Sequence, residues 1–337
     1  MLDPPDLPGK SIVSTLQEEY GIRVGDLTFL PLGSDSASWA FRVDATDGTA
    51  YFLKVRNGLD HTASLVVPRH LLDGGVPSVV GPLRTATNSL SAKADGFTLI
   101  VFPFIAGSMG ANVGLSAGGW RTLGVTLKQI HNTRLIPDLE RELRVEAFVP
   151  SRRVLIPDLE AAIASRASSD PVDAELTRSW QARRKEIRLL VDRADTLGRR
   201  LASASLPLVL CHADLHTWNV LVDGAERLWI VDWDETLLAP KERDLMFVVG
   251  GIARELVRPE DTAEFLRGYG KVTIDLVAIA YYRYAWAVQD IAAFGEQALL
   301  SPAMSLESRL AAVQGFKNLF ERGQIVDLAR ASDDFID

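Results

Sequence analysis

Apolar and polar positions alternate with a short period over the first hundred residues, which is typical of β-strands. Five apolar segments predict strands there: residues 27–32, 39–43, 50–55, 78–85 and 96–107. The sequence DATDG separates the second and third segments and predicts a hairpin turn. Helical spacing predicts short helices at 11–21 and 62–75, and Pro68 is expected to start, break or kink the second. We therefore expect a small antiparallel β lobe at residues 1–104.

Helical spacing replaces this alternation beyond Gly107. Four large apolar side chains fall on one predicted helical face: Trp120, Leu123, Leu127 and Ile130. Residues 173–203 predict a long amphipathic helix, and residues 273–294 are apolar enough to form a central helix. Because the helical pattern continues to residue 333, we expect a larger helical lobe at residues 105–337. The predicted fold class is α+β with two lobes.

Composition limits the classes of function. Hydrophobic residues make up 47% of the 337 residues, which suits a globular protein with two lobes. The net charge is −8 without any basic stripe, so we expect no nucleic-acid partner; this charge is compatible with a cationic substrate. The N-terminus does not resemble a signal peptide, and no apolar run approaches membrane-spanning length. The one cysteine, Cys211, cannot form a disulfide within the chain, so we expect a cytoplasmic location. We also expect a monomer or weak dimer without a membrane partner.

Acidic and amide side chains interrupt an apolar stretch at residues 209–236, VLCHADLHTWNVLVDGAERLWIVDWDET. If its two short strands pair through the turn DGAER, Asn219 precedes one strand and Asp232 follows the other. The two side chains could then share one site, with Asp214 facing it from the loop. Hard oxygen ligands of this kind suit Mg²⁺. The stretch therefore has the parts of a phosphoryl-transfer site, namely an acid for a hydroxyl proton and oxygen ligands for a nucleotide-bound metal.

The same segments carry a family resemblance. HADLHTWN followed by VDWD resembles the H-x-D-x-x-x-x-N and metal-binding Asp motifs of the aminoglycoside phosphotransferase family, whose fold is protein-kinase-like. The order of the lobes agrees along the whole chain. Within that family, CHADLHTWNVLVDG, IVDWDE, APKERDLMFV and GYGK are similar to segments of the spectinomycin (aminocyclitol) phosphotransferases.

The resemblance implies roles for five side chains. Asp214 matches the acid that orients and deprotonates the substrate hydroxyl. Asn219 and Asp232 match the ligands of the Mg²⁺ ion on the nucleotide phosphates. Asp234 fits a second acid with a metal, substrate or structural role. Lys54 matches the strand lysine that contacts the α- and β-phosphates.

The resemblance also implies a nucleotide site for ATP or GTP. Gly33 and the hydroxyls of Ser34, Ser36 and Ser38 take the place of a phosphate-covering hairpin, and the hinge places backbone groups of Phe102, Phe104 and Ile105 near the base. One feature departs from kinases, which pair the strand lysine with a helix glutamate. The sequence has no Glu between Lys54 and Glu140. Either an aspartate (Asp60, Asp73 or Asp95) replaces it or phosphates alone hold Lys54.

A cationic acceptor is expected in an acidic pocket of the helical lobe. The candidate residues for that pocket are Trp218, Asp234, Glu235, Tyr282, Trp286 and Asp290. Tyr282, Trp286 and Asp290 are four residues apart and share one helical face, although the aromatic side chains could equally belong to the core. We further expect an ion pair between Arg243 and Asp244, and a surface or packing role for His216.

The sequence therefore predicts a kinase that transfers the γ-phosphoryl group of ATP or GTP to an aminocyclitol or aminoglycoside, with spectinomycin as the first choice. One alternative keeps the fold and changes the acceptor to another antibiotic, a nucleoside, a sugar, choline or homoserine. A second alternative is a nucleotide-binding pseudokinase, which the missing Glu favours and the intact Asp214, Asn219 and Asp232 oppose.

Overall fold

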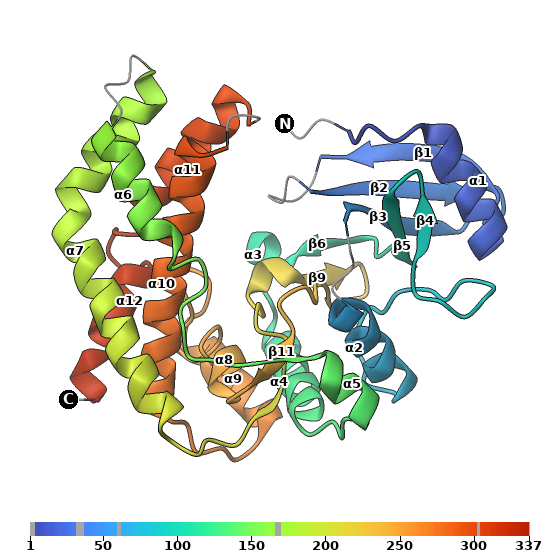
Figure 1. Ribbon diagram of the computed structural model, residues 1–337. Coiled ribbons are helices and arrows are strands. Elements are labelled where there is room, and N and C mark those ends of the chain that lie inside the picture. The colour runs from blue at the N-terminus through green and yellow to red at the C-terminus, as the bar shows by residue number, and fades with distance from the viewer. Residues whose placement is uncertain (1–3, 32–36, 59–61, 166–169, 302–303, 337) are drawn as a thin grey trace.

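A five-stranded antiparallel sheet forms the N-terminal lobe of the protein (Figure 1). The computed structural model describes residues 4–31, 37–58, 62–165, 170–301 and 304–336. The strands run in the order β1 (Val24–Leu30), β2 (Ser38–Ala45), β3 (Ala50–Asn57), β5 (Phe97–Pro103) and β4 (Ala92–Ala94). Helix α1 (Gly9–Tyr20) buries Ile12 and Leu16 in one cluster with Leu53 and Val55 of β3. Because strand side chains alternate between faces, Lys54 points to the opposite face of the sheet.

The predicted strand at residues 78–85 is absent. Its one β-bridge joins Val79 to Ile230, and Leu83 donates a backbone hydrogen bond to Val101 at 2.7 Å. Val79 belongs to the core of the helical lobe, whereas Leu83 packs against the core of the N-terminal lobe. The segment is apolar because it passes between two cores. Pro82 also lacks the N–H group that a ladder would need.

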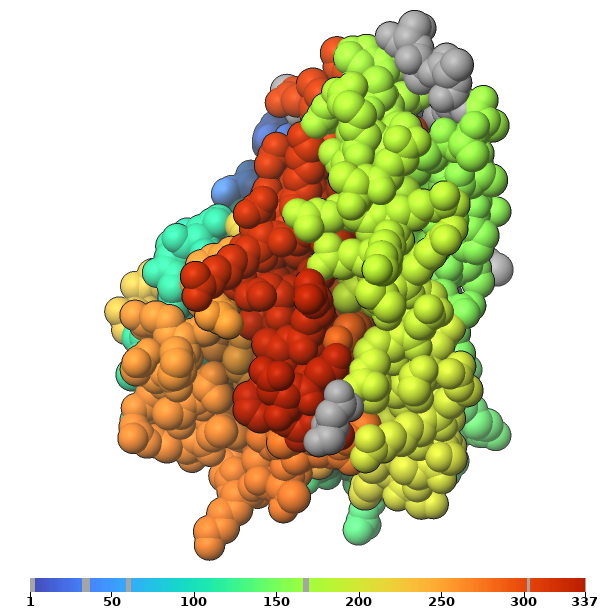
Figure 2. Space-filling model, turned by 90° about the vertical axis from the view of Figure 1, so that its left-hand side faces the viewer, coloured from blue at the N-terminus to red at the C-terminus, as the bar shows by residue number. Residues whose placement is uncertain are grey.

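Helices dominate the rest of the chain. Their bounds are α2 (Thr62–Asp73), α3 (Gly110–Val113), α4 (Ala117–His131), α5 (Pro137–Glu142), α6 (Leu155–Ser165), α7 (Pro171–Ala202), α8 (Glu242–Leu245), α9 (Pro259–Tyr269), α10 (Leu276–Leu299), α11 (Leu306–Asn318) and α12 (Ile325–Ala331), with 3₁₀ turns η1 (Thr217–Asn219) and η2 (Asp333–Phe335). The apolar helix α10 packs against α6, α7, α8, α11 and α12 and is the centre of this lobe. Figure 2 shows α7 beside the C-terminal helices on the outer face of the molecule.

Two small sheets lie between the N-terminal sheet and the helical layer (Figure 1). One contains β6 (Gly107–Met109), β9 (Val220–Asp223) and β10 (Leu228–Ile230), and the other contains β7 (Arg144–Val145), β8 (Val209–Cys211) and β11 (Leu237–Ala239). Strands β9 and β10 are antiparallel, with Val220 opposite Ile230, so the predicted hairpin is present.

This arrangement confirms the predicted α+β fold with a β-rich N-terminal lobe and a larger helical lobe. Strand β5 ends at Pro103 and β6 begins at Gly107, and the boundary between residues 104 and 105 stays a prediction. Among the described residues, no helix has both the length and the apolar character needed to cross a membrane.

Candidate active site

The loop between β8 and β9 brings Asp214 and Asn219 together. The Asn219 side-chain amide donates to the Asp214 carboxylate and to its backbone carbonyl, both at 2.8 Å. Turn η1 ends at Asn219, so the amide is held at the entrance of β9. Two residues five positions apart therefore form one hydrogen-bonded polar pair.

The second carboxylate oxygen of Asp214 faces His216, whose Nε2 lies 3.2 Å away. The His216 ring packs edge-on against Phe247 and Trp286, with ring centres 5.8 and 6.3 Å apart. Burial opposes a charge on His216, but the Asp214 carboxylate outweighs burial and raises the pKa of the imidazole. His216 therefore packs against aromatic side chains as expected, and it also forms an ion pair with Asp214.

Asp244 braces the backbone of the same loop from behind. Its carboxylate accepts hydrogen bonds from the His212 and Ala213 amides at 3.0 and 2.6 Å, and His131 Nε2 lies 2.9 Å away. Ala213 has a φ of +69°, a conformation that costs free energy for a residue with a Cβ. Asp244 is fully buried; burial favours its neutral form, but the partner His131 outweighs this effect and lowers the pKa. These contacts hold the loop in its strained shape.

The expected ion pair between Arg243 and Asp244 does not form. The Arg243 guanidinium lies over the rings of Tyr282 and Trp286, 5.6 and 5.4 Å from their centres. Neighbouring residues at the start of a short helix point in different directions, so Asp244 turns to the loop and Arg243 turns to the aromatic side chains of α10.

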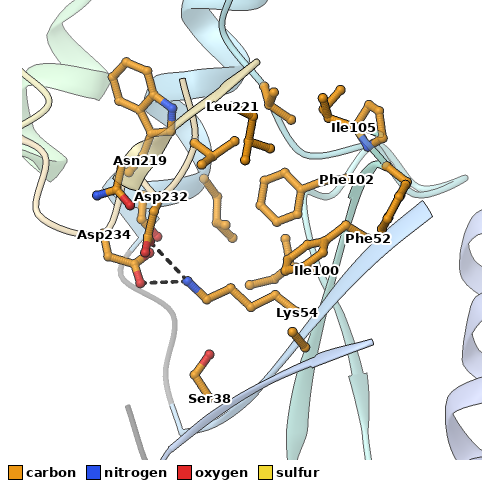
Figure 3. Close-up of a pocket in the computed structure, with 18 of the residues that line it drawn as sticks. Ser38, Phe52, Lys54, Ile100, Phe102, Ile105, Asn219, Leu221, Asp232 and Asp234 are labelled. Carbon is orange, nitrogen blue, oxygen red and sulfur yellow. Dashed lines mark hydrogen bonds and ion pairs between the residues drawn. The ribbon is translucent and has the colours of Figure 1, made fainter. Parts of the chain in front are cut away.

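A cavity of about 480 Å³ lies between the N-terminal sheet and the β9–β10 hairpin. Apolar and aromatic side chains line much of it: Ala40, Phe52, Ile100, Phe102, Phe104, Ile105, Met109 and Leu221. Charged and amide side chains gather at one end: Lys54, Asn219, Asp232 and Asp234 (Figure 3). Arg56 also lines the cavity. Ser38 and Trp218 also line it. An apolar slot that leads to a polar end suits a ligand with a flat base and a charged tail.

Lys54 finds its partners in the segment that follows β10. Its ammonium lies 2.8 Å from Asp234 and 3.4 Å from Asp232 (Figure 3). Asp73, one of the aspartates considered as a substitute for the helix glutamate, pairs with Arg69 and Arg84. The acids of the DWD segment therefore hold the strand lysine.

The two acids of this segment have opposite pKa shifts. Burial raises the pKa of Asp232, and the Lys54 charge only partly offsets this effect. Burial acts in the same direction on Asp234, but the charges of Lys54 and Arg56 outweigh it and lower the pKa. Asp232 has a φ of +62°, so the backbone is strained where its carboxylate enters the cavity.

Not every predicted residue is found in the described lining of this cavity. Gly33, Ser34 and Ser36 fall outside the described residues, as does Asp60. Exposed Glu235 pairs with Arg144 at 3.2 Å.

On helix α10, two of the three predicted side chains belong to the aromatic interior. Tyr282 is 1% exposed, and Trp286 packs against Phe247 at 4.9 Å. Asp290 is different, because burial and then the Asp214 charge raise its pKa to about 7. Asp290 is therefore close enough to Asp214 for the charges of the two carboxyl groups to interact.

Sequence reasoning gave no role in the site to three residues: Arg56, His216 and Asp244. Arg56 stands two positions after Lys54 in YFLKVR, so strand alternation places both cations on one face. His216 stands two positions after Asp214 and could have been weighed as its partner. Asp244 was expected to pair with Arg243, but it meets the loop from about thirty residues away.

Comparisons with known proteins agree with this geometry. The family model described as "Phosphotransferase enzyme family" matches residues 28–286. A crystal structure of spectinomycin phosphotransferase in complex with ADP and spectinomycin is 32% identical, covers 98% of this chain and 100% of that chain, and has a TM-score of 0.88. An AMP-bound complex of spectinomycin phosphotransferase is 31% identical, with 96% and 98% covered and a TM-score of 0.83.

A more distant structure shares only the fold with this chain. An aminoglycoside phosphotransferase from Alicyclobacillus acidocaldarius is 18% identical, with 99% and 98% of the chains covered and a TM-score of 0.61. No curated protein matches the chain.

Proposed function

The chain belongs to the phosphotransferase enzyme family, and we propose that it transfers the γ-phosphoryl group of ATP to a hydroxyl of spectinomycin or a related cationic aminocyclitol. It is a small-molecule phosphotransferase with an alcohol group as acceptor. One observation carries the finer proposal: a spectinomycin phosphotransferase with bound ADP and spectinomycin matches the chain over its whole length at 32% identity. ATP is the favoured donor over GTP because both spectinomycin phosphotransferase structures hold adenine nucleotides.

Asp214 is proposed as the catalytic acid–base residue. One carboxylate oxygen is held by Asn219 and the other lies beside His216, so the group has a fixed direction. The acceptor oxygen bonds to the γ-phosphorus, and its proton passes to Asp214. The bond from the γ-phosphorus to the bridging oxygen breaks, and its electron pair leaves with ADP. Positioning and charge stabilisation supply most of the rate in such reactions.

Asn219 and Asp232 are proposed as Mg²⁺ ligands. The Asn219 amide nitrogen is used by Asp214, which leaves its carbonyl oxygen for a cation, and the Asp232 carboxylate faces the cavity (Figure 3). Two hard oxygen donors suit Mg²⁺, which completes its shell with water and phosphate oxygens. When bound, the ion would offset negative charge on the phosphates.

The nucleotide is proposed to lie along the cavity. The base would contact Phe102, Phe104 and Ile105 at the apolar end, and the phosphates would reach Lys54 and Ser38. The glycine and serines of the segment before β2, Gly33, Ser34 and Ser36, stay candidates for covering the phosphates.

Asp290 is proposed as the anchor for a cationic acceptor. Its raised pKa follows first from burial and then from the Asp214 charge, so a bound ammonium group would favour its charged form. Trp218, 45% exposed beside Asn219, would form an apolar wall of the acceptor site. Negative charge beside the reacting hydroxyl thus selects cationic alcohols.

Incubating the protein with Mg²⁺, ATP and a panel of alcohols is expected to add one phosphoryl group to spectinomycin, detected by mass spectrometry. The panel contains aminocyclitols, aminoglycosides, choline, homoserine, sugars and nucleosides, and parallel reactions use GTP. Efficient transfer to spectinomycin supports the proposal. Transfer to another alcohol alone would reject spectinomycin, and bound nucleotide without any transfer would favour a pseudokinase.

A matched variant makes this test sharper. Asp290→Asn cannot carry the negative charge that a bound ammonium group would favour, and it keeps the side-chain shape. It should raise KM several-fold for cationic acceptors and leave neutral acceptors unchanged. Equal effects on both classes would contradict the anchoring role.

Replacing Asp232 with asparagine is expected to weaken Mg²⁺-ATP binding by at least about 10-fold, because a charged oxygen ligand is lost. Calorimetric titration with and without Mg²⁺ measures the effect, and ATP binding without the ion is the internal control. The role as metal ligand fails if Mg²⁺ strengthens ATP binding equally in both proteins.

A further inference from the structure

Strand β3 directs one aromatic side chain and then two cationic side chains into the cavity. Phe52, Lys54 and Arg56 alternate with Leu53 and Val55, which are fully buried on the other face of the sheet. The first of the three lies opposite Phe102 at the apolar end, and the last lies opposite Ser38 on β2. The row thus runs from an aromatic ring through one cation to a second cation.

The second cation, Arg56, has no assigned role. Its side chain is 9% exposed, and its guanidinium pairs with Asp234. Its Nε–H group is buried and has no acceptor among the residues that the structure describes. A buried donor without a partner costs free energy, so the residue is held where an additional anionic acceptor would stabilise it.

A single carboxylate oxygen serves both cations. Asp234 Oδ2 accepts from Lys54 at 2.8 Å and also from Arg56. Asp232 supplies a second carboxylate, which lies farther from Lys54, at 3.4 Å, whereas Asp234 is the ion-pair partner that the structure gives for Arg56. Within the described lining of the cavity, Lys54 and Arg56 are the two cationic side chains. They form a cationic end whose two side chains share one carboxylate oxygen.

We propose that Arg56 is a second phosphate-binding residue, which contacts the terminal phosphate of the nucleotide while Lys54 contacts the phosphates nearer the ribose. This inference rests on the proposed nucleotide site. Two residues along a strand span about 6.6 Å, so Arg56 lies one step farther from the hinge than Lys54. Asp234 is the counter-ion that holds both cations in place and yields them to phosphate oxygens.

The chemistry of arginine suits this position. Its planar guanidinium offers several N–H groups in a fixed fork and can hold two oxygens of one phosphate, whereas an ammonium acts as a point charge. A terminal phosphate has three such oxygens and changes its bonding during transfer. Arg56 would therefore orient the group that moves, and it should contribute to the affinity for ATP but not to that for AMP or adenosine.

The test compares the wild type with Arg56→Met and Arg56→Lys by calorimetric titration with ATP, ADP, AMP and adenosine. Arg56→Met should weaken ATP binding by about 10-fold to 100-fold, the loss expected for charged hydrogen bonds. AMP and adenosine should bind as in the wild type. Arg56→Lys keeps the charge but loses the fork, and it should recover part of the ATP affinity.

Two controls separate a phosphate contact from a structural role. Arg84→Met removes a partly exposed arginine of the N-terminal lobe that pairs with Asp73 outside the cavity, and it should leave all four ligands unaffected. Thermal unfolding shows whether Arg56→Met is folded; if it is not, Arg56→Lys alone must show the selective loss for ATP.

The outcomes are distinct. Equal losses for ATP and adenosine, or ATP binding at wild-type strength, would overturn the role of Arg56 while the wild type still transfers phosphate. A wild type that binds no nucleotide would overturn the proposed function and this inference together.

Discussion

Replacing Asp214 with alanine is expected to lower kcat for phosphoryl transfer by about 10²–10⁴-fold, the usual contribution of a positioned acid or base. The loss is large because the carboxylate is held on both sides, by Asn219 at 2.8 Å and by His216 at 3.2 Å. Nucleotide affinity should stay close to that of the wild type, because Asp214 does not line the cavity between the sheet and the hairpin. Steady-state kinetics and calorimetric titration measure the two quantities.

Asparagine at position 214 is the matched control. Asp214→Asn keeps the shape and a hydrogen-bonding oxygen but cannot accept the hydroxyl proton, so its kcat should fall nearly as far as in the alanine variant. A near-normal kcat in either variant would remove Asp214 from the catalytic role. A parallel collapse of nucleotide binding would instead indicate that the variant distorts the loop.

Features that are local in sequence could be predicted from the sequence. Period-two alternation predicted a strand at 50–55, and β3 spans Ala50–Asn57. The β9–β10 hairpin could be predicted because its strands and turn are contiguous, and it places Asn219 and Asp232 on one cavity.

Contacts between distant segments could not be predicted. The partners of Lys54 are Asp232 and Asp234, about 180 residues away, and no helical or strand period relates such positions. Residues 78–85 have an apolar pattern that fits a strand, yet they are apolar because two cores bury them. Tyr282 and Trp286 share a helical face as predicted, but the pattern cannot tell a binding surface from the interior of a lobe.

The same reasoning explains why one acid near the site was given the wrong partner. Asp244 follows Arg243 in sequence, so a local pair was the natural expectation. The fold instead brings it to the amides of His212 and Ala213 and to His131 on α4, which is 113 residues away. A single buried carboxylate thus ties helix α4 to the loop that carries Asp214.

Replacing Asp244 with alanine is therefore expected to lower the free energy of unfolding by about 3–5 kcal/mol, the cost of removing one partner from a buried charged network. Two backbone N–H groups and the His131 ring would lose their acceptor inside the protein. Denaturation by urea measures the loss, and kcat should fall as well because the strained loop at Ala213 is released.

A second buried acid distinguishes loop positioning from general destabilisation. Asp261 is 8% exposed and pairs with Arg258 at the start of α9, outside the loop that carries Asp214. Asp261→Ala should lower stability without lowering kcat at a temperature where the protein stays folded. If Asp244→Ala also keeps a normal kcat under that condition, its contacts stabilise the fold but do not position Asp214. A selective loss of kcat would show that the reactive geometry depends on a carboxylate that does not touch the substrate.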